Sequence, residues 1–221
     1  MLVTVYQPWL TFDCYDTLVR YTESKTKFLT NLVHSKGGSD KTVATARTEF
    51  EVFEKKLQLG KFMVLTNVLR KSLHSAMDSV GMTATASDEV NMIEAVKNAN
   101  PFPDVHAALK DLQKDHRLAI LSNSEPEIIK YNIASIGIDF DAVVLASEAM
   151  CYKPATAMFQ ELLKRIGEPP ENVTHIAQSF YHDMRTAKDF GFGRRLWINR
   201  FKRACDVAYM PDKELSDLFG V

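Results

Sequence analysis

The chain has 221 residues, a formal net charge of −1 and 46% hydrophobic residues, which is an ordinary composition for a globular protein. The near-neutral charge argues against nucleic acid or an anionic membrane as a partner. No apolar run reaches the length of a membrane span, and the N-terminus does not resemble a secretory signal, so we expect no membrane partner.

The cysteines bear on the cellular compartment. Cys14, Cys151 and Cys205 are odd in number and widely spaced. This pattern favours a reducing compartment over a disulfide framework or a zinc site, and we therefore expect a cytoplasmic protein.

The first predicted element is an apolar run, residues 2–12, which stops abruptly at Asp13 and is followed by Asp16 and Thr17. Apolar runs that end at a polar cluster are typical of buried parallel strands. Ligands of open α/β sheets bind outside the carboxyl ends of the strands, so Asp13 would stand at the mouth of the sheet. A carboxylate there can act as nucleophile, base or metal ligand, although it can equally cap the next helix.

Residues 18–98 have a helical pattern throughout. Four segments repeat apolar side chains at the period of an α-helix, and glycines separate them. Four helices without a strand predict a helical bundle inserted after the first strand. We therefore expect a four-helix cap over residues 18–98 and a core formed by residues 1–17 and 99–221.

From residue 99 onward the pattern alternates between helix and strand. Short apolar runs predict strands at residues 117–121, 142–146, 173–177 and 196–198, with helical segments between them. Alternation of this kind predicts an α/β fold, a Rossmann-like parallel sheet with helices on both faces. The tail after Asp206 is expected to form a short helix.

Polar residues follow several of the predicted strands. They are Asp13, Thr17, Ser122, Asn123, Lys153 and Asp183. Parallel strands bring these ends to one edge, where Asp13 would attack an electrophile whose anionic group is held by hydroxyl, amide and ammonium groups. Lys153 beside Asp13 would also keep that carboxylate ionised. The plainer alternatives are helix caps and, for Lys153, a surface lysine.

In this order, these residues resemble the four motifs of the haloacid dehalogenase superfamily over nearly the whole chain. The segments 12–18, 121–123, 152–154 and 197–200 are similar to those of the type II 2-haloacid dehalogenases. The resemblance implies that Asp13 displaces halide from the carbon beside a carboxylate, without a cofactor. Water activated near Asp183 and Lys153 would then open the ester. Thr17, Ser122 and Asn123 would orient the nucleophile and the substrate carboxylate. The further residues expected to contact substrate are Tyr15, Asp16 and Ser179.

The chain departs from the family pattern at several positions. Superfamily phosphatases carry an acid two residues after the nucleophile, and here that residue is Tyr15. The dehalogenases usually have Gly at the position of Asp16, Tyr at that of Phe159, and Asn where this chain has Phe180. Their cap arginine has no clear counterpart. The candidates for it are Arg47, Lys55 and Lys56, of which the lysines also suit a solvated helix face.

Two alternatives therefore stay open beside the dehalogenase. A small-molecule phosphatase would hold Mg²⁺ with Asp13, Asp183 and the carbonyl of Tyr15, and Asp16 would replace the missing acid. A binding or regulatory protein could keep the fold and lack turnover, because function depends on the site. Either enzyme would take a small anionic substrate, and homodimerisation is left open.

Two histidines are assigned no role. His182 is expected to face solvent at the start of a helix, and His175 to be a packed core residue or a surface residue.

Overall fold

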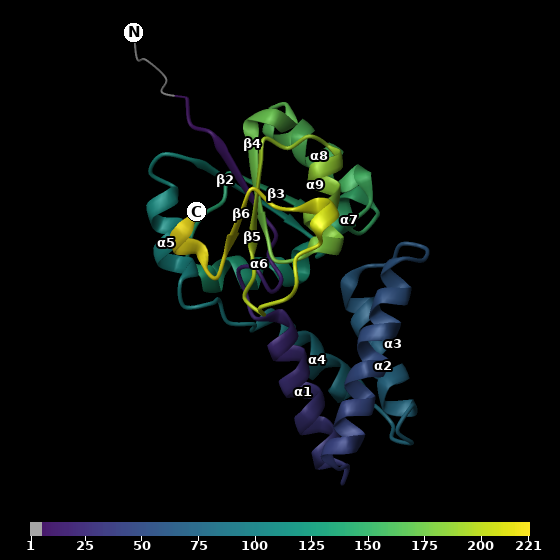
Figure 1. The fold of residues 1–221 in the computed structure, drawn as a ribbon. Coiled ribbons are helices and arrows are strands. Elements are labelled where there is room, and N and C mark those ends of the chain that lie inside the picture. Colours follow the sequence, from purple (N-terminus) through teal and green to yellow (C-terminus); the bar gives the residue numbers. More distant parts are fainter. Residues whose placement is uncertain (1–5) are drawn as a thin grey trace.

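The computed structural model describes residues 6–221, in which a sheet-containing core lies above a helical bundle (Figure 1). Within these residues, six parallel strands form one sheet in the order β3-β2-β1-β4-β5-β6. The strands are β1 (Trp9–Phe12), β2 (Arg117–Ser122), β3 (Ala142–Leu145), β4 (Val173–Ala177), β5 (Arg194–Ile198) and β6 (Lys213–Leu215). The predicted α/β class with a parallel sheet is confirmed.

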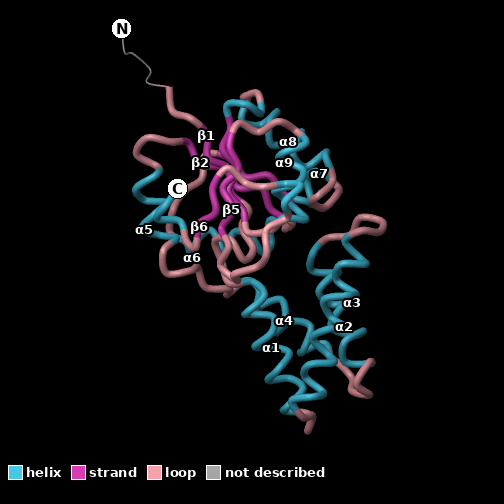
Figure 2. Tube along the Cα trace, in the orientation of Figure 1, coloured by secondary structure: helices cyan, strands magenta, loops and turns pink. Residues whose placement is uncertain are grey.

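Helices cover both faces of the sheet, as Figure 2 shows in cyan around the magenta strands. Parallel strands require crossover connections, and here helices supply them and bury the apolar side chains of both faces. On β1, Leu10 and Phe12 contribute to one apolar cluster and Trp9 to the other. The core helices are α5 (Val105–Leu112), α6 (Pro126–Ile136), α7 (Ala146–Ala149), α8 (Thr156–Ile166) and α9 (Arg185–Asp189).

The helical bundle lies at the carboxyl ends of the strands (Figure 1). Its helices are α1 (Tyr21–Ser35), α2 (Asp40–Gln58), α3 (Leu65–Asp78) and α4 (Ala86–Lys97). Reciprocal capping boxes start two of them, at Ser39 before α2 and at Thr85 before α4. Buried side chains such as Phe50 and Leu69 face inward and hold the bundle together.

Two adjacent segments connect the core with the helical bundle. The backbone N–H of Arg20 donates to the carbonyl of Asn100 at 2.9 Å, and that of Phe102 donates to the carbonyl of Leu18 at 3.0 Å. The chain thus leaves and re-enters the core at one place. We propose that the bundle is a separate cap domain with the expected boundaries, residues 18–98.

The C-terminal tail differs from the sequence prediction. A short helix after Asp206 was expected, and this was wrong: β6 extends the sheet, flanked by single 3₁₀ turns. Asp212 fixes the start of β6, because its carboxylate accepts from the backbone N–H of Arg195 at 2.7 Å and its own N–H donates to the Arg195 carbonyl. With only three residues, β6 has too short a pattern to recognise.

The first strand is also shorter than its apolar run, since β1 begins at Trp9. Residues 2–5 of the predicted strand lie outside the described residues. In the part of the chain that the structure describes, no helix combines the length and apolar character needed to cross a bilayer.

Candidate active site

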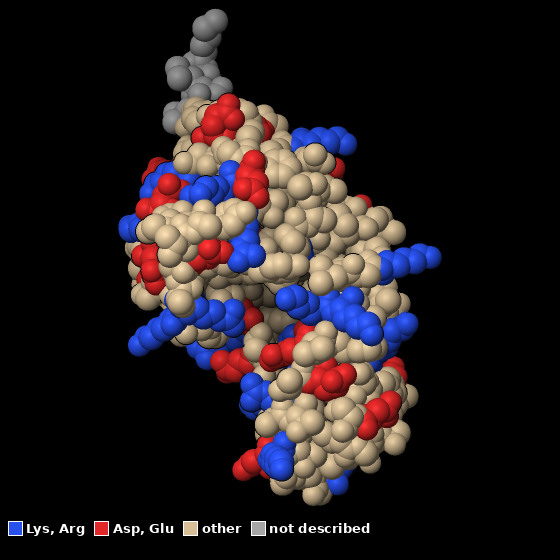
Figure 3. Space-filling view, turned by 45° about the vertical axis from the view of Figure 1, so that its right-hand side comes forward, with Lys and Arg blue, Asp and Glu red and all other residues tan. Residues whose placement is uncertain are grey.

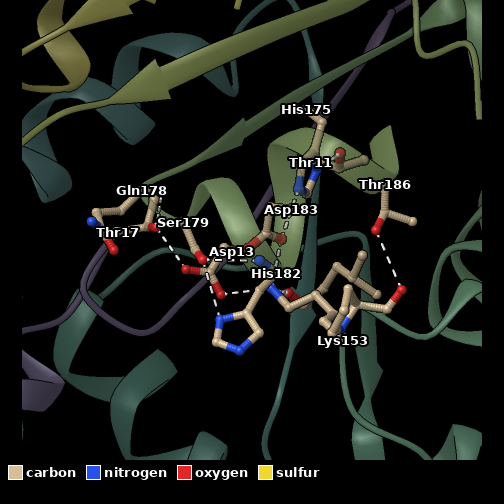
Figure 4. A network of polar contacts seen from close by, with 12 residues as sticks. Thr11, Asp13, Thr17, Lys153, His175, Gln178, Ser179, His182, Asp183 and Thr186 are labelled. Atoms are coloured by element: carbon tan, nitrogen blue, oxygen red, sulfur yellow. Dashed lines mark hydrogen bonds and ion pairs between the residues drawn. The ribbon is translucent and has the colours of Figure 1, made fainter. Parts of the chain in front are cut away.

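Asp13 is the first residue beyond β1 and lies at the floor of the site (Figure 4). Its backbone N–H donates to the carbonyl of Ile176 at 3.0 Å, and its side chain is largely buried. The Thr17 hydroxyl donates to Asp13 Oδ2 at 2.7 Å, and Lys153 Nζ donates to Oδ1 at 2.8 Å. Both carboxylate oxygens are therefore held in a fixed orientation.

Lys153 joins two carboxylates. Its Nζ also donates to Asp183 Oδ1 at 2.7 Å and to the carbonyl of Leu121 at 2.9 Å, so three acceptors match its three protons. Lys153 and Asp183 are almost completely buried. Burial raises the pKa of Asp13, and the Lys153 ammonium brings it part of the way back. Burial opposes ionisation of Asp183 as well, but Lys153 and His175 outweigh it and lower the pKa of Asp183 to about 2.

His175 belongs to this network, although it was expected to be a packed core residue or a surface residue without a role. It is a fully buried residue of β4, with Nε2 3.0 Å from Asp183 Oδ1 and Nδ1 2.8 Å from the Thr11 hydroxyl. Because an ionised carboxylate only accepts hydrogen bonds, Nε2 carries the proton. The sequence did contain an indication of this role, because an imidazole inside a buried parallel strand requires a polar partner.

One carboxylate oxygen of the network lacks a hydrogen bond. Asp183 Oδ2 is buried and has no hydrogen-bond partner among the described residues. Buried carboxylate oxygens are normally satisfied, so this one is available to a water molecule, a substrate group or a cation.

Asp16 occupies a special backbone position. Its φ of 61° lies in the left-handed region, which glycine favours and aspartate tolerates better than most residues. This conformation accounts for an aspartate where related proteins usually have glycine. Both carboxylate oxygens accept from Thr22, one from its N–H at 2.9 Å and one from its hydroxyl, so the side chain binds the first turn of α1 while lining the cavity described below.

Tyr15 forms part of the wall beside Asp13. Its hydroxyl lies 2.7 Å from the Ser124 hydroxyl, and its ring stacks on that of Tyr21 with 4.1 Å between centroids. Burial raises the pKa of Tyr15 well above its ordinary value, so the phenol keeps its proton at neutral pH.

The two polar residues at the carboxyl end of β2 lie in different environments. Ser122 is fully buried, its hydroxyl has no partner among the described residues, and it does not line the cavity. Asn123 lines the cavity and holds the backbone of Lys153, accepting from its N–H at 2.6 Å and donating to its carbonyl at 3.3 Å.

The segment after β4 supplies three further lining residues. The Gln178 N–H donates to the Thr17 hydroxyl at 2.9 Å, and Ser179 Oγ accepts from the N–H of His182 at 3.0 Å. His182 was expected to face solvent, but the structure places it half-buried in the cavity wall within the π-helical turn Phe180–Met184. Burial lowers the pKa of His182 to about 4, so the ring is neutral at physiological pH.

These groups surround a cavity of about 390 Å³ between the core and the helical bundle, here called the central cavity. Figure 3 shows the hollow between the two parts, with charged side chains on both sides. Its lining includes Asp13, Tyr15, Asp16, Asn123, Lys153, Ser179 and Asp183 from the core, and Tyr21, Lys25, Glu51, Glu54, Lys55 and Gln58 from the bundle. Among the expected counterparts of the cap arginine, Lys55 lines this cavity, whereas Arg47 and Lys56 do not.

The helical bundle contributes its own buried ion pair to the central cavity. Lys25 Nζ donates to Glu54 Oε2, and the Tyr21 hydroxyl donates to Glu54 Oε1 at 2.7 Å. Lys25 Nζ also lies 4.1 Å from the centroid of the Tyr21 ring. This pair was not predicted, because both residues lie on helix faces that are recognised by their apolar spacing.

Arg200 fixes the loop that carries Asp13 and Thr17. Its Nε donates to the Thr17 carbonyl at 3.0 Å, and its guanidinium donates to both oxygens of Asp104 at 3.0 and 2.9 Å. Such a fork restrains position more tightly than a single hydrogen bond. The segment after β5 thereby restrains the loop that follows β1.

Comparisons with known proteins agree with this arrangement. A family model of haloacid dehalogenase-like hydrolases matches residues 9–191. The chain is 22% identical over 198 residues to an (S)-2-haloacid dehalogenase of Pseudomonas fluorescens, which covers 88% of this chain and 86% of the relative. It is 28% identical over 102 residues to an N-acylneuraminate-9-phosphatase of Mus musculus, which covers 45% of this chain and 41% of the relative.

The overall fold also resembles that of solved structures. The solved L-2-haloacid dehalogenase of Xanthobacter autotrophicus superposes with a TM-score of 0.81 at 20% identity, over 96% of each chain. Because the family model covers most of its length, the chain belongs to the haloacid dehalogenase-like hydrolases.

Proposed function

We propose that this hydrolase forms a covalent ester on Asp13 and cleaves the carbon–halide bond of a small carboxylic acid. The observation that carries the proposal is the environment of Asp13. Its two oxygens accept from Thr17 and Lys153 at 2.7 and 2.8 Å, and the carboxylate faces the central cavity. A carboxylate that is paired, oriented and open to a cavity meets the requirements of a nucleophile.

In the first step, one oxygen of Asp13 attacks the carbon that carries the halogen. A carbon–oxygen bond forms, and the halide leaves with the electron pair of the broken bond. Halide needs no proton donor to leave. This matters because Tyr15, which stands where superfamily phosphatases carry an acid, shares a hydrogen bond with Ser124 and has a raised pKa.

In the second step, water attacks the carbonyl carbon of the Asp13 ester. Asp183 is ionised, and its unpartnered Oδ2 accepts a hydrogen bond that orients this water. The ester bond breaks, one proton of the water ends on the oxygen of the departing 2-hydroxy acid, and the other is released. Lys153 stays within hydrogen-bond distance of Asp13 and compensates the charge that develops there.

A Mg²⁺-dependent phosphatase is the second candidate. The unpartnered Oδ2 of Asp183 favours it, because a buried carboxylate oxygen suits a hard cation. Asp13, Asp183 and the Tyr15 carbonyl would hold the ion, which would neutralise charge on a transferring phosphoryl group. Within residues 6–221, however, no three His, Cys, Asp or Glu side chains are grouped to bind a metal.

The deciding experiment uses L-2-chloropropionate in heavy-oxygen water, with wild-type protein, Asp13→Asn and the surface control Asp189→Asn. We expect chloride release, heavy oxygen in the Asp13 peptide by mass spectrometry, and a loss of at least about 10⁴-fold in Asp13→Asn only. Chloride release with heavy oxygen absent from Asp13 would contradict the ester.

A parallel arm uses an aryl phosphate with Mg²⁺. Phosphate release that requires both the metal and Asp13 would assign the protein to the phosphatases. No turnover in either arm, with folded protein, would favour the binding or regulatory alternative.

A further inference from the structure

A second cavity of about 410 Å³ adjoins the central cavity. The two share four lining residues, Lys55, Gln178, Ser179 and Arg203. Binding sites for small molecules measure about 300–1,000 Å³, so the central cavity alone accommodates a small haloacid. The proposed reaction therefore leaves the second cavity without a role.

The two cavities differ in charge. Five carboxylates and four cations line the central cavity, whereas three cations and one carboxylate line the second. In the second cavity, Arg185 is already neutralised, because its Nε and Nη2 donate to Asp206 Oδ2 at 3.1 and 2.7 Å. The remaining cations are Lys55 and Arg203, and neither forms an ion pair within residues 6–221. The second cavity thus has two positive charges to offer a ligand.

Neighbouring residues position both cations without neutralising their charge. Lys55 belongs to α2, and its Nζ lies 4.8 Å from the centroid of the Tyr181 ring of the core. The backbone of Arg203 is fixed twice by Asn199, which accepts from its N–H at 2.8 Å and donates to its carbonyl at 2.9 Å.

An aromatic wall lies beside these cations. The half-buried ring of Phe180 lines the second cavity and meets the almost completely buried ring of Trp197 behind it edge-to-face, with 4.5 Å between centroids. Such a wall suits the apolar part of a ligand, whereas the cations suit an anionic group.

We propose that the second cavity binds a distal anionic group, a carboxylate or a phosphate, of a substrate whose reacting end lies at Asp13. The connecting chain lies on Phe180, which Trp197 supports from behind, and the charge lies between Lys55 and Arg203. One cation comes from the helical bundle and the other from the core, so the bound anion also links the bundle to the core. The assignment of the reacting end rests on the proposed function.

The kinetic test compares racemic 2-chloroadipate with racemic 2-chlorohexanoate, which has the same chain length and lacks the distal carboxylate. We expect wild-type kcat/KM to be about tenfold higher for the dianion, since each of two partly exposed charge contacts contributes about threefold. In Lys55→Gln/Arg203→Gln the two acids should react equally. The control Lys56→Gln/Lys202→Gln removes two neighbouring surface charges and should keep the preference. Equal rates in wild type, or a preference retained in the first variant, would overturn the proposal.

Calorimetric titration separates this proposal from the chemistry at Asp13, because it needs no turnover. Adipate should bind wild type about tenfold more tightly than hexanoate, and the difference should vanish in Lys55→Gln/Arg203→Gln. Titration with 5-phosphonopentanoate then shows whether a carboxylate or a phosphate group is preferred. Selective adipate binding without chloride release would refute the dehalogenase and leave the distal site standing. Equal binding, or no binding of either acid, would refute the distal site.

Discussion

The two sides of the central cavity each contain a buried ammonium, and only one of them contacts Asp13, the proposed nucleophile. On the core side, Lys153 contacts Asp13 and Asp183, which lie far apart in the sequence and meet at the ends of parallel strands. On the side of the helical bundle, Lys25 pairs with Glu54 across two adjacent helices. Burial and pairing are alike in both, so the proposed function assigns a part in the reaction only to the ammonium that contacts Asp13.

The largest expected effect comes from removing each ammonium in turn. Lys153→Met and Lys25→Met each leave buried carboxylate unpaired, which should lower the free energy of unfolding by about 3–5 kcal/mol in urea titrations. The turnover rate should distinguish the two variants. Lys153→Met should lose about 10²–10³-fold in kcat, as expected for a lost charge-stabilising donor, and Lys25→Met less than about tenfold.

A surface variant, Lys56→Met, serves as the control and should change neither stability nor turnover appreciably. Comparable losses of kcat in Lys153→Met and Lys25→Met would show that the bundle pair acts on the reaction as directly as the core pair.

A smaller effect is expected from His175→Leu, which leaves no donor at this position. The change removes a hydrogen bond to ionised Asp183, and such bonds contribute about 1.5–3 kcal/mol to stability. The folded-state pKa of Asp183, about 2, is below its unfolded value of about 3.9. Its stabilising contribution is therefore complete above the unfolded pKa and is lost as the pH falls through about 2. The deficit of His175→Leu should be largest at neutral pH and shrink as the pH falls below about 4.

The matched control for this prediction is Phe192→Leu. Its ring packs against that of His175, with 5.8 Å between centroids, and carries no charge. Chemical unfolding of both variants at neutral and acidic pH should give a pH-independent deficit for Phe192→Leu. The same behaviour in His175→Leu would mean that His175 only fills space.

The core side of the cavity could be predicted from the sequence, because parallel topology fixes where strands end. Asp13, Asn123, Lys153 and Asp183 each follow a recognisable apolar run, and the structure brings all four to the central cavity. Ser122 follows the same rule yet is buried away from the cavity, since neighbouring residues at a strand end point in opposite directions.

The bundle side could not be predicted in the same way. The positions of Lys25 and Glu54 depend on how α1 packs against α2, and helical periodicity marks apolar positions without identifying charged ones among them. His182 was misplaced for a related reason. A π-helical turn replaces the regular helix start and points its ring into the cavity wall.

The smallest effect is expected at Tyr15, the residue of the core that touches the ring of Tyr21 in the bundle. Tyr15→Phe loses one hydrogen bond to Ser124, which should lower the free energy of unfolding by about 1 kcal/mol. Ser124→Ala removes the same hydrogen bond by deleting its other partner and should lower the free energy of unfolding by a similar amount. In both variants kcat should fall less than about threefold, because a departing halide takes no proton, whereas a true general acid contributes about 10²–10⁴-fold. A loss of 10²-fold or more in Tyr15→Phe alone would identify the phenol as a proton donor. The leaving group would then be an alkoxide, which needs a proton, and this result would favour the phosphatase over the dehalogenase.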